Sequence, residues 1–269
     1  MKLLCKILRV TRSAYYRYEK APRANKDEKL MVEIRALHVK TNKAYGSRRM
    51  SKYLQMKNYK IGRYKARSLM RKAGIECKQR RRYRITTQSD ARLPVAENIL
   101  NRGFSVAQPN RVWLADITYI QTQEGWLYLA AVLDVYSRRI VGWALADHMR
   151  QSLVGNALIM ALGRRKPKKD LLHHSDRGSQ YASFDYQALL QKSGITVSMS
   201  RKGNCWDNAV MERFFGSLKS ERTEGKKYVT REHAKADIID YIEMFYNGQR
   251  LHSTLGYVSP VHYEYALVS

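Results

Sequence analysis

The sequence has few cysteines, few acidic residues and no long apolar run. Cys5, Cys77 and Cys205 are far apart and form no CxxC pair, which excludes a disulfide framework or a cysteine zinc site and fits a reducing compartment. No stretch approaches the roughly 20 apolar residues of a membrane span. Lys6 and Arg9 interrupt the apolar opening, which therefore makes a poor signal peptide. We expect a cytoplasmic protein that does not bind a membrane.

The shortage of acidic residues leaves a large positive charge. Against 23 acidic residues stand 50 basic ones, a net charge of +27. Self-repulsion destabilises so charged a compact chain unless a polyanion offsets it, which indicates a nucleic acid partner. Residues 1–92 hold 28 basic and 6 acidic residues, a net charge of +22, whereas the remaining 177 residues have a net charge of only +5. This contrast predicts a DNA-binding region over residues 1–78, a basic linker over 79–108 and a second domain over 109–269.

The first region shows apolar residues at helical spacing. Two predicted helices, 47–57 and 62–73, are joined at residues 58–60, and Gly74 ends the second. Helix pairs are common, but a short connection together with this charge favours a DNA-binding helix-turn-helix. The expected phosphate contacts are the basic residues of these helices and of the linker: Arg48, Arg49, Arg63, Lys65, Arg67, Arg71, Lys72, Arg80, Arg81 and Arg82.

The second region alternates β-rich and helical segments. Three β-rich runs, 112–120, 126–135 and 139–147, come first. They are followed by a helix (151–162), a strand (170–175), a helix (183–192), a strand (195–200) and two final helices, 207–222 and 230–246. This order predicts an α/β fold in which helices cover a mixed sheet, the ribonuclease-H-like architecture.

Three acidic residues of this region are candidates for a metal site. Asp116 lies inside the first strand, Asp176 follows a strand where the chain must turn, and Glu212 lies in a helix. A carboxylate in a covered sheet is costly unless a cation or hydrogen-bond donors meet it. Divalent cations such as Mg²⁺ prefer oxygen ligands, and two of them about 3.5–4 Å apart can catalyse phosphoryl transfer. Asn208 and Lys219 are near the helix face of Glu212.

Several neighbouring residues have competing interpretations. Asp134, Asp147 and Asp207 are alternative acidic residues. The consecutive His173 and His174 would point to opposite faces of a strand, so they cannot easily serve one ion. Asn208 is first a helix-cap candidate and only second a DNA contact.

The spacing of the acidic residues resembles that of the DDE transposases and retroviral integrases. Asp116 and Asp176 are separated by 59 residues, Asp176 and Glu212 by 35, and Lys219 follows the glutamate by seven positions. The segments WLADITYI, GWLYLAAVLDVYSRRIVGWAL, HHSDRGSQY, SRKGNCWDNAVMERFFGSLKSE and YNGQRLHSTLGYVSP resemble the second-frame protein of bacterial insertion sequences of family three. The segments YGSRRM and LCKILRVTRSAYYRYEK extend the resemblance into the helical region.

The resemblance implies a transposase of the bacterial cytoplasm, associated with the nucleoid. It would use Mg²⁺, for which Mn²⁺ can substitute, to cleave DNA at the ends of an insertion sequence and join the 3′-hydroxyl to another phosphodiester. Asp116 would bridge the two ions, Asp176 and Glu212 would complete their ligand shells, and Lys219 would hold terminal DNA. The implied partners are the double-stranded DNA of the terminal repeats and of the target, further copies of the chain, and a first-frame protein joined by frameshift fusion. The C-terminal residues of the resemblance have structural or DNA-backbone roles, a choice left open: Tyr246, Asn247, Arg250 and His252.

Three other functions remain as alternatives. A non-catalytic DNA-binding regulator would explain the charge but would leave the carboxylates without a role. A simple metal nuclease would cut DNA without joining it. A structural chromatin-like protein is the least favoured, since such chains rarely contain a sheet with a central aspartate.

Overall fold

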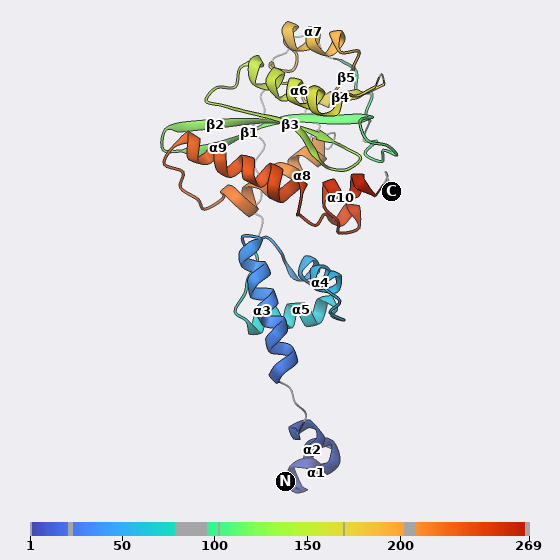
Figure 1. Cartoon of the computed structure of the whole chain (residues 1–269), viewed down its shortest axis with the longest axis vertical. Coiled ribbons are helices and arrows are strands. Elements are labelled where there is room, and N and C mark those ends of the chain that lie inside the picture. Colours follow the sequence, from blue (N-terminus) through green and yellow to red (C-terminus); the bar gives the residue numbers. More distant parts are fainter. Residues whose placement is uncertain are drawn as a thin grey trace. The chain divides into compact units, whose positions relative to one another are not determined.

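The computed structural model describes residues 2–20, 24–78, 96–101, 103–168, 170–201 and 208–266. The chain divides into two compact units, Met1–Lys78 and Gln79–Ser269 (Figure 1). No helix within the described ranges is long and apolar enough to cross a bilayer.

The described part of the first unit is helical. Thr11 precedes the helix that begins at Arg12, and its Oγ1 atom accepts a hydrogen bond of 3.2 Å from the Ala14 N–H. The helices are α1 (Lys2–Ile7), α2 (Arg12–Lys20), α3 (Ala24–Lys40), α4 (Ser47–Met56) and α5 (Arg63–Lys72).

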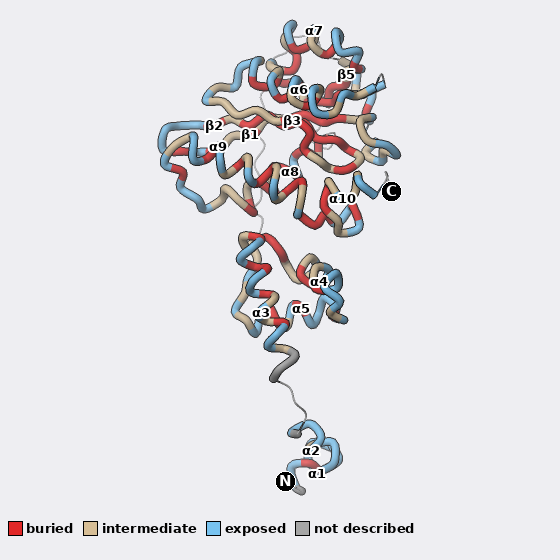
Figure 2. The backbone as a smooth tube through the Cα atoms, viewed as in Figure 1, coloured by how far each residue is buried: buried red, intermediate tan, exposed pale blue. Residues whose placement is uncertain are grey.

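Helices α4 and α5 are the predicted helix pair, and α5 contacts both α3 and α4. Each of the three helices buries an apolar stripe, which Figure 2 shows in red. Ile34 of α3, Leu54 of α4 and Leu69 of α5 are fully buried. Burial of these stripes holds the helix pair against α3, because short helices in water are marginally stable without such packing.

The second unit contains a five-stranded mixed sheet with the strand order β3-β2-β1-β4-β5. The β1–β2 and β2–β3 pairs are antiparallel, and the β1–β4 and β4–β5 pairs are parallel. The predicted ribonuclease-H-like arrangement is therefore confirmed. The strands are β1 (Val112–Thr122), β2 (Gly125–Asp134), β3 (Ile140–Ala146), β4 (Leu172–Ser175) and β5 (Thr196–Met199). The helical segments are α6 (Gln151–Arg165), α7 (Phe184–Lys192), α8 (Ala209–Leu218), η2 (Lys219–Thr223), α9 (Arg231–Asp240), η3 (Tyr241–Asn247), η4 (Ser253–Leu255) and α10 (Pro260–Tyr265).

Helices cover both faces of the sheet, with α6 and α7 on one side and α8 and α9 on the other (Figure 1). The side chains of β1 alternate between these layers. Trp113 and Ala115 belong to the cluster under α6 and α7, whereas Leu114 and Ile120 belong to the cluster under α8 and α9. At Gly142 of β3, an added Cβ atom would lie 2.2 Å from the Ala157 carbonyl oxygen, so α6 can approach the sheet only over a glycine.

The C-terminal segment is fastened to the sheet by buried polar contacts. The Asn247 side-chain amide accepts from the Ile140 N–H and donates to the Ile140 carbonyl oxygen, both at 2.9 Å. The Glu264 carboxylate of α10 accepts from Arg165 at 2.8 and 2.9 Å. These contacts fix η3 to β3 of the sheet and α10 to the end of α6.

Candidate active site

Asp116 lies on β1, and Asp176 lies one residue after the end of the neighbouring parallel strand β4. The β1–β4 register pairs Val112 with Leu172 and Leu114 with His174. Continued for two more residues, this register places Asp116 opposite Asp176, one position after the end of β4. Neighbouring strands are about 4.8 Å apart. Both residues are half-buried and lie two positions beyond Leu114 and His174, the last paired residues of β1 and β4.

Backbone N–H groups orient both carboxylates. The Ile117 N–H donates to Asp116 Oδ1 at 2.7 Å, and the Gly178 N–H donates to Asp176 Oδ1 at 2.9 Å. An added Cβ atom on Gly178 would lie 3.0 Å from that same oxygen. Glycine at this position is therefore favoured, because a side chain there would crowd the Asp176 carboxylate.

The surroundings of the pair disfavour negative charge. Burial raises the pKa of Asp116 well above its usual value, and the nearby charges of Asp176 and Glu212 raise the pKa further. The Ile117 N–H and the Lys219 ammonium group act in the opposite direction. Burial also raises the pKa of Asp176. Such a pair is stabilised in its ionised form by a cation placed close to it.

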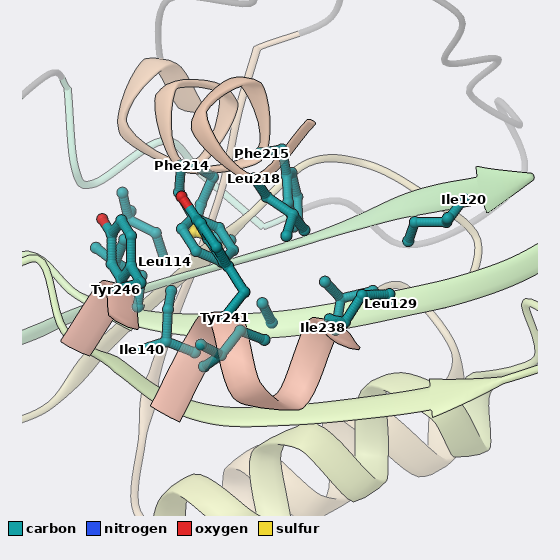
Figure 3. Packing of buried hydrophobic residues seen from close by; sticks show 14 of the residues in the cluster. Leu114, Ile120, Leu129, Ile140, Phe214, Phe215, Leu218, Ile238, Tyr241 and Tyr246 are labelled. Carbon is teal, nitrogen blue, oxygen red and sulfur yellow. The ribbon is translucent and has the colours of Figure 1, made fainter. Parts of the chain in front are cut away.

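Glu212 is carried by α8, whose apolar face packs over the sheet. Met211, Phe214, Phe215 and Leu218 are buried at helical spacing in the cluster that includes Leu114 of β1 (Figure 3). Glu212 follows Met211 and is itself exposed.

The prediction that folding gathers all three carboxylates is met only in part. Asp176 and Glu212 both lie within electrostatic reach of Asp116, because the charge of each raises the pKa of Asp116. Within the described residues, however, no three acidic, histidine or cysteine side chains are close enough to hold one metal ion. The buried apolar residues of α8 fix the position of the helix. They do not fix how far the exposed Glu212 side chain extends toward Asp116.

Lys219 lies beside the aspartate pair. Its Nζ atom is 4.9 Å from the centroid of the Tyr119 ring on β1. Burial lowers the pKa of Lys219, and the negative charge of Asp116 partly opposes this effect. A half-buried cation near the Asp116 carboxylate can contact a phosphate that approaches it.

The cap interpretation of Asn208 is right in position but not in side-chain bonding. Asn208 occupies the N-cap position of α8, but its side chain makes no capping hydrogen bond. The side chain is 6% exposed, and its Oδ1 atom has no hydrogen-bond partner among the described residues. Its predicted DNA contact stays a prediction.

The alternative acidic and metal-binding candidates have other surroundings. Asp134 is fully buried and accepts from Arg165 at 3.1 Å, while Asp147 is exposed. His174 Nδ1 is hydrogen-bonded to Ser198 Oγ and His173 Nε2 to the Tyr186 hydroxyl, both at 2.9 Å, so the two histidines have separate partners as expected. Asp207 lies outside the described residues.

Burial decides between the structural and the DNA-backbone roles that were left open for the C-terminal residues. Tyr246, Asn247, Arg250 and His252 are between 2% and 8% exposed. Arg250 donates to both Glu221 carboxylate oxygens, at 2.6 and 2.7 Å. These residues are therefore structural in this fold.

The basic residues of the first unit differ in their availability. Arg48, Arg63, Arg67, Arg71 and Lys72 are exposed, although Lys72 also lies 3.9 Å from Asp27.

Two predicted phosphate contacts of this unit are engaged within the protein. Lys65 forms a 2.7 Å ion pair with Asp27. Arg49 donates to the Ala44 carbonyl oxygen at 3.5 Å and lies over the Tyr45 ring. The predicted contacts Arg80, Arg81 and Arg82 lie outside the described residues.

Comparison with known proteins supports both units. An integrase core domain model matches residues 106–205, a second integrase core domain model matches residues 212–266, and an HTH-like domain model matches residues 25–83. The chain is 46% identical over 260 residues to the insertion element IS600 uncharacterized 31 kDa protein of Shigella sonnei, covering 96% of each chain. It is 38% identical to the transposase InsF for insertion sequence IS3A of Escherichia coli K12, covering 98% of this chain and 93% of that protein.

The chain belongs to the IS3 family of transposases. Among solved structures, the HTLV-2 integrase catalytic core domain in complex with magnesium aligns with a TM-score of 0.46 at 14% identity, over 58% of this chain and 97% of that one. The IS3-family chain is thus an enzyme with an integrase core and an HTH-like region.

Sequence reasoning missed one buried residue near the IS3-family carboxylates. Tyr181 ends the turn that begins at Asp176, and the charges of Asp116 and Asp176 both affect its hydroxyl. A tyrosine in a turn has no pattern that distinguishes it from an ordinary core residue, so the sequence offers no signal for it.

Proposed function

We propose that this IS3-family transposase cleaves DNA at the ends of an insertion sequence and joins the freed 3′-hydroxyl to another phosphodiester by two-metal-ion catalysis. The observation that carries the proposal is the alignment of Asp116 with Asp176 two residues beyond the last paired residues of two parallel strands, together with the effect of Asp176 and Glu212 on the pKa of Asp116. Glu212 and Lys219 both lie within electrostatic reach of Asp116. In this proposal the three acidic residues are the catalytic metal ligands.

The donor set fits Mg²⁺, or Mn²⁺ in its place, because carboxylate oxygens are the ligands that such cations prefer. Burial and neighbouring charge raise the pKa of Asp116. A divalent cation would therefore offset the free-energy cost of ionising this carboxyl group. When bound, two such ions activate the attacking oxygen and stabilise the leaving oxygen. Repulsion between carboxylates opposes the approach of Glu212, and the same cations would favour it.

The remaining residues of the site would bind the DNA substrate. Lys219 would hold a phosphate near Asp116, a role supported by its position over the Tyr119 ring and by its effect on the pKa of Asp116. Asn208 at the start of α8 is a second, weaker candidate for such a contact.

The two units would have different roles in transposition. Residues 1–78 would bind double-stranded DNA at the terminal repeats through Arg63, Arg67 and Arg71 of α5, with Arg48 and Lys72 as further phosphate contacts. Residues 79–108 would serve as a basic linker that includes Arg80, Arg81 and Arg82, and residues 109–269 would act on the element ends and the target. Two ends require two active sites, so the working form would be a homo-oligomer, with a first-frame protein as a fusion partner.

Replacement of Asp116 by asparagine tests the catalytic role. We expect Asp116→Asn to retain DNA binding and to lose cleavage and joining by at least about two to three orders of magnitude, as when a group that stabilises the transition state is removed. The measurement is a gel assay with Mg²⁺ and labelled DNA from the ends that flank the reading frame. Burial disfavours the ionised carboxyl, so the melting temperature of the variant should not fall.

The exposed Asp147 provides the matched control. Asp147→Asn should leave cleavage and joining unchanged. If Asp116→Asn retained full activity, the metal site would be wrong and a DNA-binding regulator would be favoured. If the wild-type protein cut its ends without ever joining them, a simple nuclease would be favoured.

A further inference from the structure

A pair of aromatic rings lies near the turn of the β1–β2 hairpin, outside the apolar core. Trp126 of β2 is 45% exposed, and its ring meets the half-buried Tyr119 ring of β1 edge-to-face, with centroids 5.0 Å apart. Neither residue belongs to the two buried clusters that hold the sheet and its helices together. Core packing therefore does not explain why two large rings lie side by side at this surface.

The backbone around Trp126 is held by contacts on both sides. The Thr122 hydroxyl donates to the Gly125 carbonyl oxygen at 2.6 Å, and Arg231 Nε donates to the Trp126 carbonyl oxygen at 3.2 Å. The Arg231 backbone N–H donates to the Glu124 carboxylate at 2.8 Å. The rings thus form a preformed surface, which loses little conformational freedom when it binds a ligand.

Positive charge adjoins the aromatic pair. Lys219 Nζ lies 4.9 Å from the centroid of the Tyr119 ring, and the Arg231 guanidinium group contacts the Trp126 backbone. Single-stranded nucleic acids bind to surfaces of this kind, because their bases stack on aromatic rings while cations contact their phosphates. An apolar partner would use the rings but would leave the cations unmatched, so the charge favours a nucleic acid.

The aromatic pair lies close to the candidate metal site. Asp116 and Tyr119 are three residues apart on β1, which corresponds to about 10 Å of strand. Phosphates of one strand of duplex DNA are about 3.4 Å apart along the axis, so this distance spans about three nucleotides. β4 pairs with β1 only as far as Leu114 and leaves the following edge of β1 uncovered. Because side chains alternate across a strand, a DNA strand that passes this edge can meet Asp116 on one face and Tyr119 on the other.

We propose that Trp126 and Tyr119 form a stacking platform for an unpaired nucleobase of the DNA strand whose phosphate Lys219 holds. The inference rests on the proposed function, because that function supplies the DNA strand. A base reaches the rings only after it leaves the duplex stack. Binding at the platform would therefore keep the last base pairs of the DNA end open near Asp116.

Two DNA probes in metal-free buffer test the platform with the full-length protein. One is a fully paired duplex of the element end, and the other has mismatches at its last three base pairs, so that both strands are unpaired there. Trp126→Ala should weaken binding of the mismatched duplex about 5- to 150-fold, the usual contribution of stacking one base. Its affinity for the paired duplex should not change, and Trp126→Phe should retain most of the affinity for both probes.

A 2-aminopurine base among the mismatches reports the stacking directly, since its fluorescence falls when it contacts an aromatic ring. The wild-type protein should quench this fluorescence, and Trp126→Ala should not. Phe184→Ala is the matched control, because Phe184 is another aromatic residue of the same unit and is 86% exposed at the start of α7. This variant should bind both probes and quench the fluorescence as the wild-type protein does.

Wild-type affinity and quenching in Trp126→Ala would overturn the inference, and weaker self-association of that variant in sedimentation would then assign the rings to a second copy of the chain. An equal loss of affinity for both probes would assign Trp126 to duplex binding and would also overturn the inference. The proposed function is tested separately, by Asp116→Asn in Mg²⁺. Either outcome for Trp126 would therefore leave the assignment of the metal site unchanged.

Discussion

At the scale of single residues, His173 is a titratable group that the fold keeps neutral. Burial lowers its pKa from 6.5 to about 3, and the neighbouring His174 adds to this effect. Between these two pH values the unfolded chain binds a proton that the folded chain does not. The unfolding free energy should therefore fall as the pH decreases through this window, by at most about 1.4 kcal/mol per pH unit from this residue.

The contribution of His173 can be separated by substitution. His173→Asn should be less stable than the wild-type protein at neutral pH, and its stability should depend less steeply on pH between 6.5 and 3. Urea denaturation at several pH values within the window measures both slopes. Equal slopes in the two proteins would show that another group causes the acid sensitivity.

The sequence allows some residue roles to be predicted and not others. Asp116 could be selected because a carboxylate inside an apolar strand is costly, and Asp176 because it follows a strand. The roles of Asn247 and Arg250 could not be decided, because burial of a polar side chain depends on distant partners. Asn247 bonds to Ile140, which is 107 positions away in the sequence.

At the scale of elements, a buried ion pair connects η2 with the chain that follows η3. Arg250 donates to both carboxylate oxygens of Glu221, and the Tyr241 hydroxyl donates to the same group at 2.9 Å. Removal of one partner leaves an uncompensated buried charge. We therefore expect Glu221→Gln to lower the unfolding free energy by about 3–5 kcal/mol in denaturant titrations.

An exposed ion pair of the same unit provides the comparison. Glu232 and Lys235 are paired at 2.6 Å on α9, with the Glu232 side chain 80% exposed. Glu232→Gln should change the unfolding free energy by less than about 1 kcal/mol. A similarly small effect of Glu221→Gln would mean that the buried pair does not hold these elements together.

The helices and strands follow the sequence pattern closely, apart from α10 (Pro260–Tyr265), which was not predicted, and two local changes of helix type. The predicted helices 207–222 and 230–246 were continuous, whereas the structure changes to π-helical turns at Lys219–Thr223 and Tyr241–Asn247. Apolar spacing within one or two turns fits either helix type, so periodicity cannot show the change. The strand register that aligns Asp116 with Asp176 could not be predicted from the sequence either, because register depends on pairing between distant segments.

At the scale of the whole molecule, positive charge is concentrated in the first part of the chain. Residues 1–92 have a net charge of +22, whereas the remaining 177 have +5. This contrast could be read from composition alone, but the choice of binding residues could not. Arg63, Arg67 and Arg71 are exposed at four-residue spacing along α5. Their side chains therefore lie near one another on the helix surface.

If α5 binds the DNA backbone, those three arginines should dominate the salt dependence of binding. Each phosphate contact contributes about 0.9 to the slope of log affinity against log salt concentration. Replacement of all three by glutamine should reduce the slope by about 2–3 on duplex DNA. The exposed Lys166, Lys168 and Lys192 of the second unit offer a control of equal charge, and their replacement by glutamine should change the slope far less. Equal reductions would assign binding to net charge spread over the chain and contradict a dedicated DNA-binding unit.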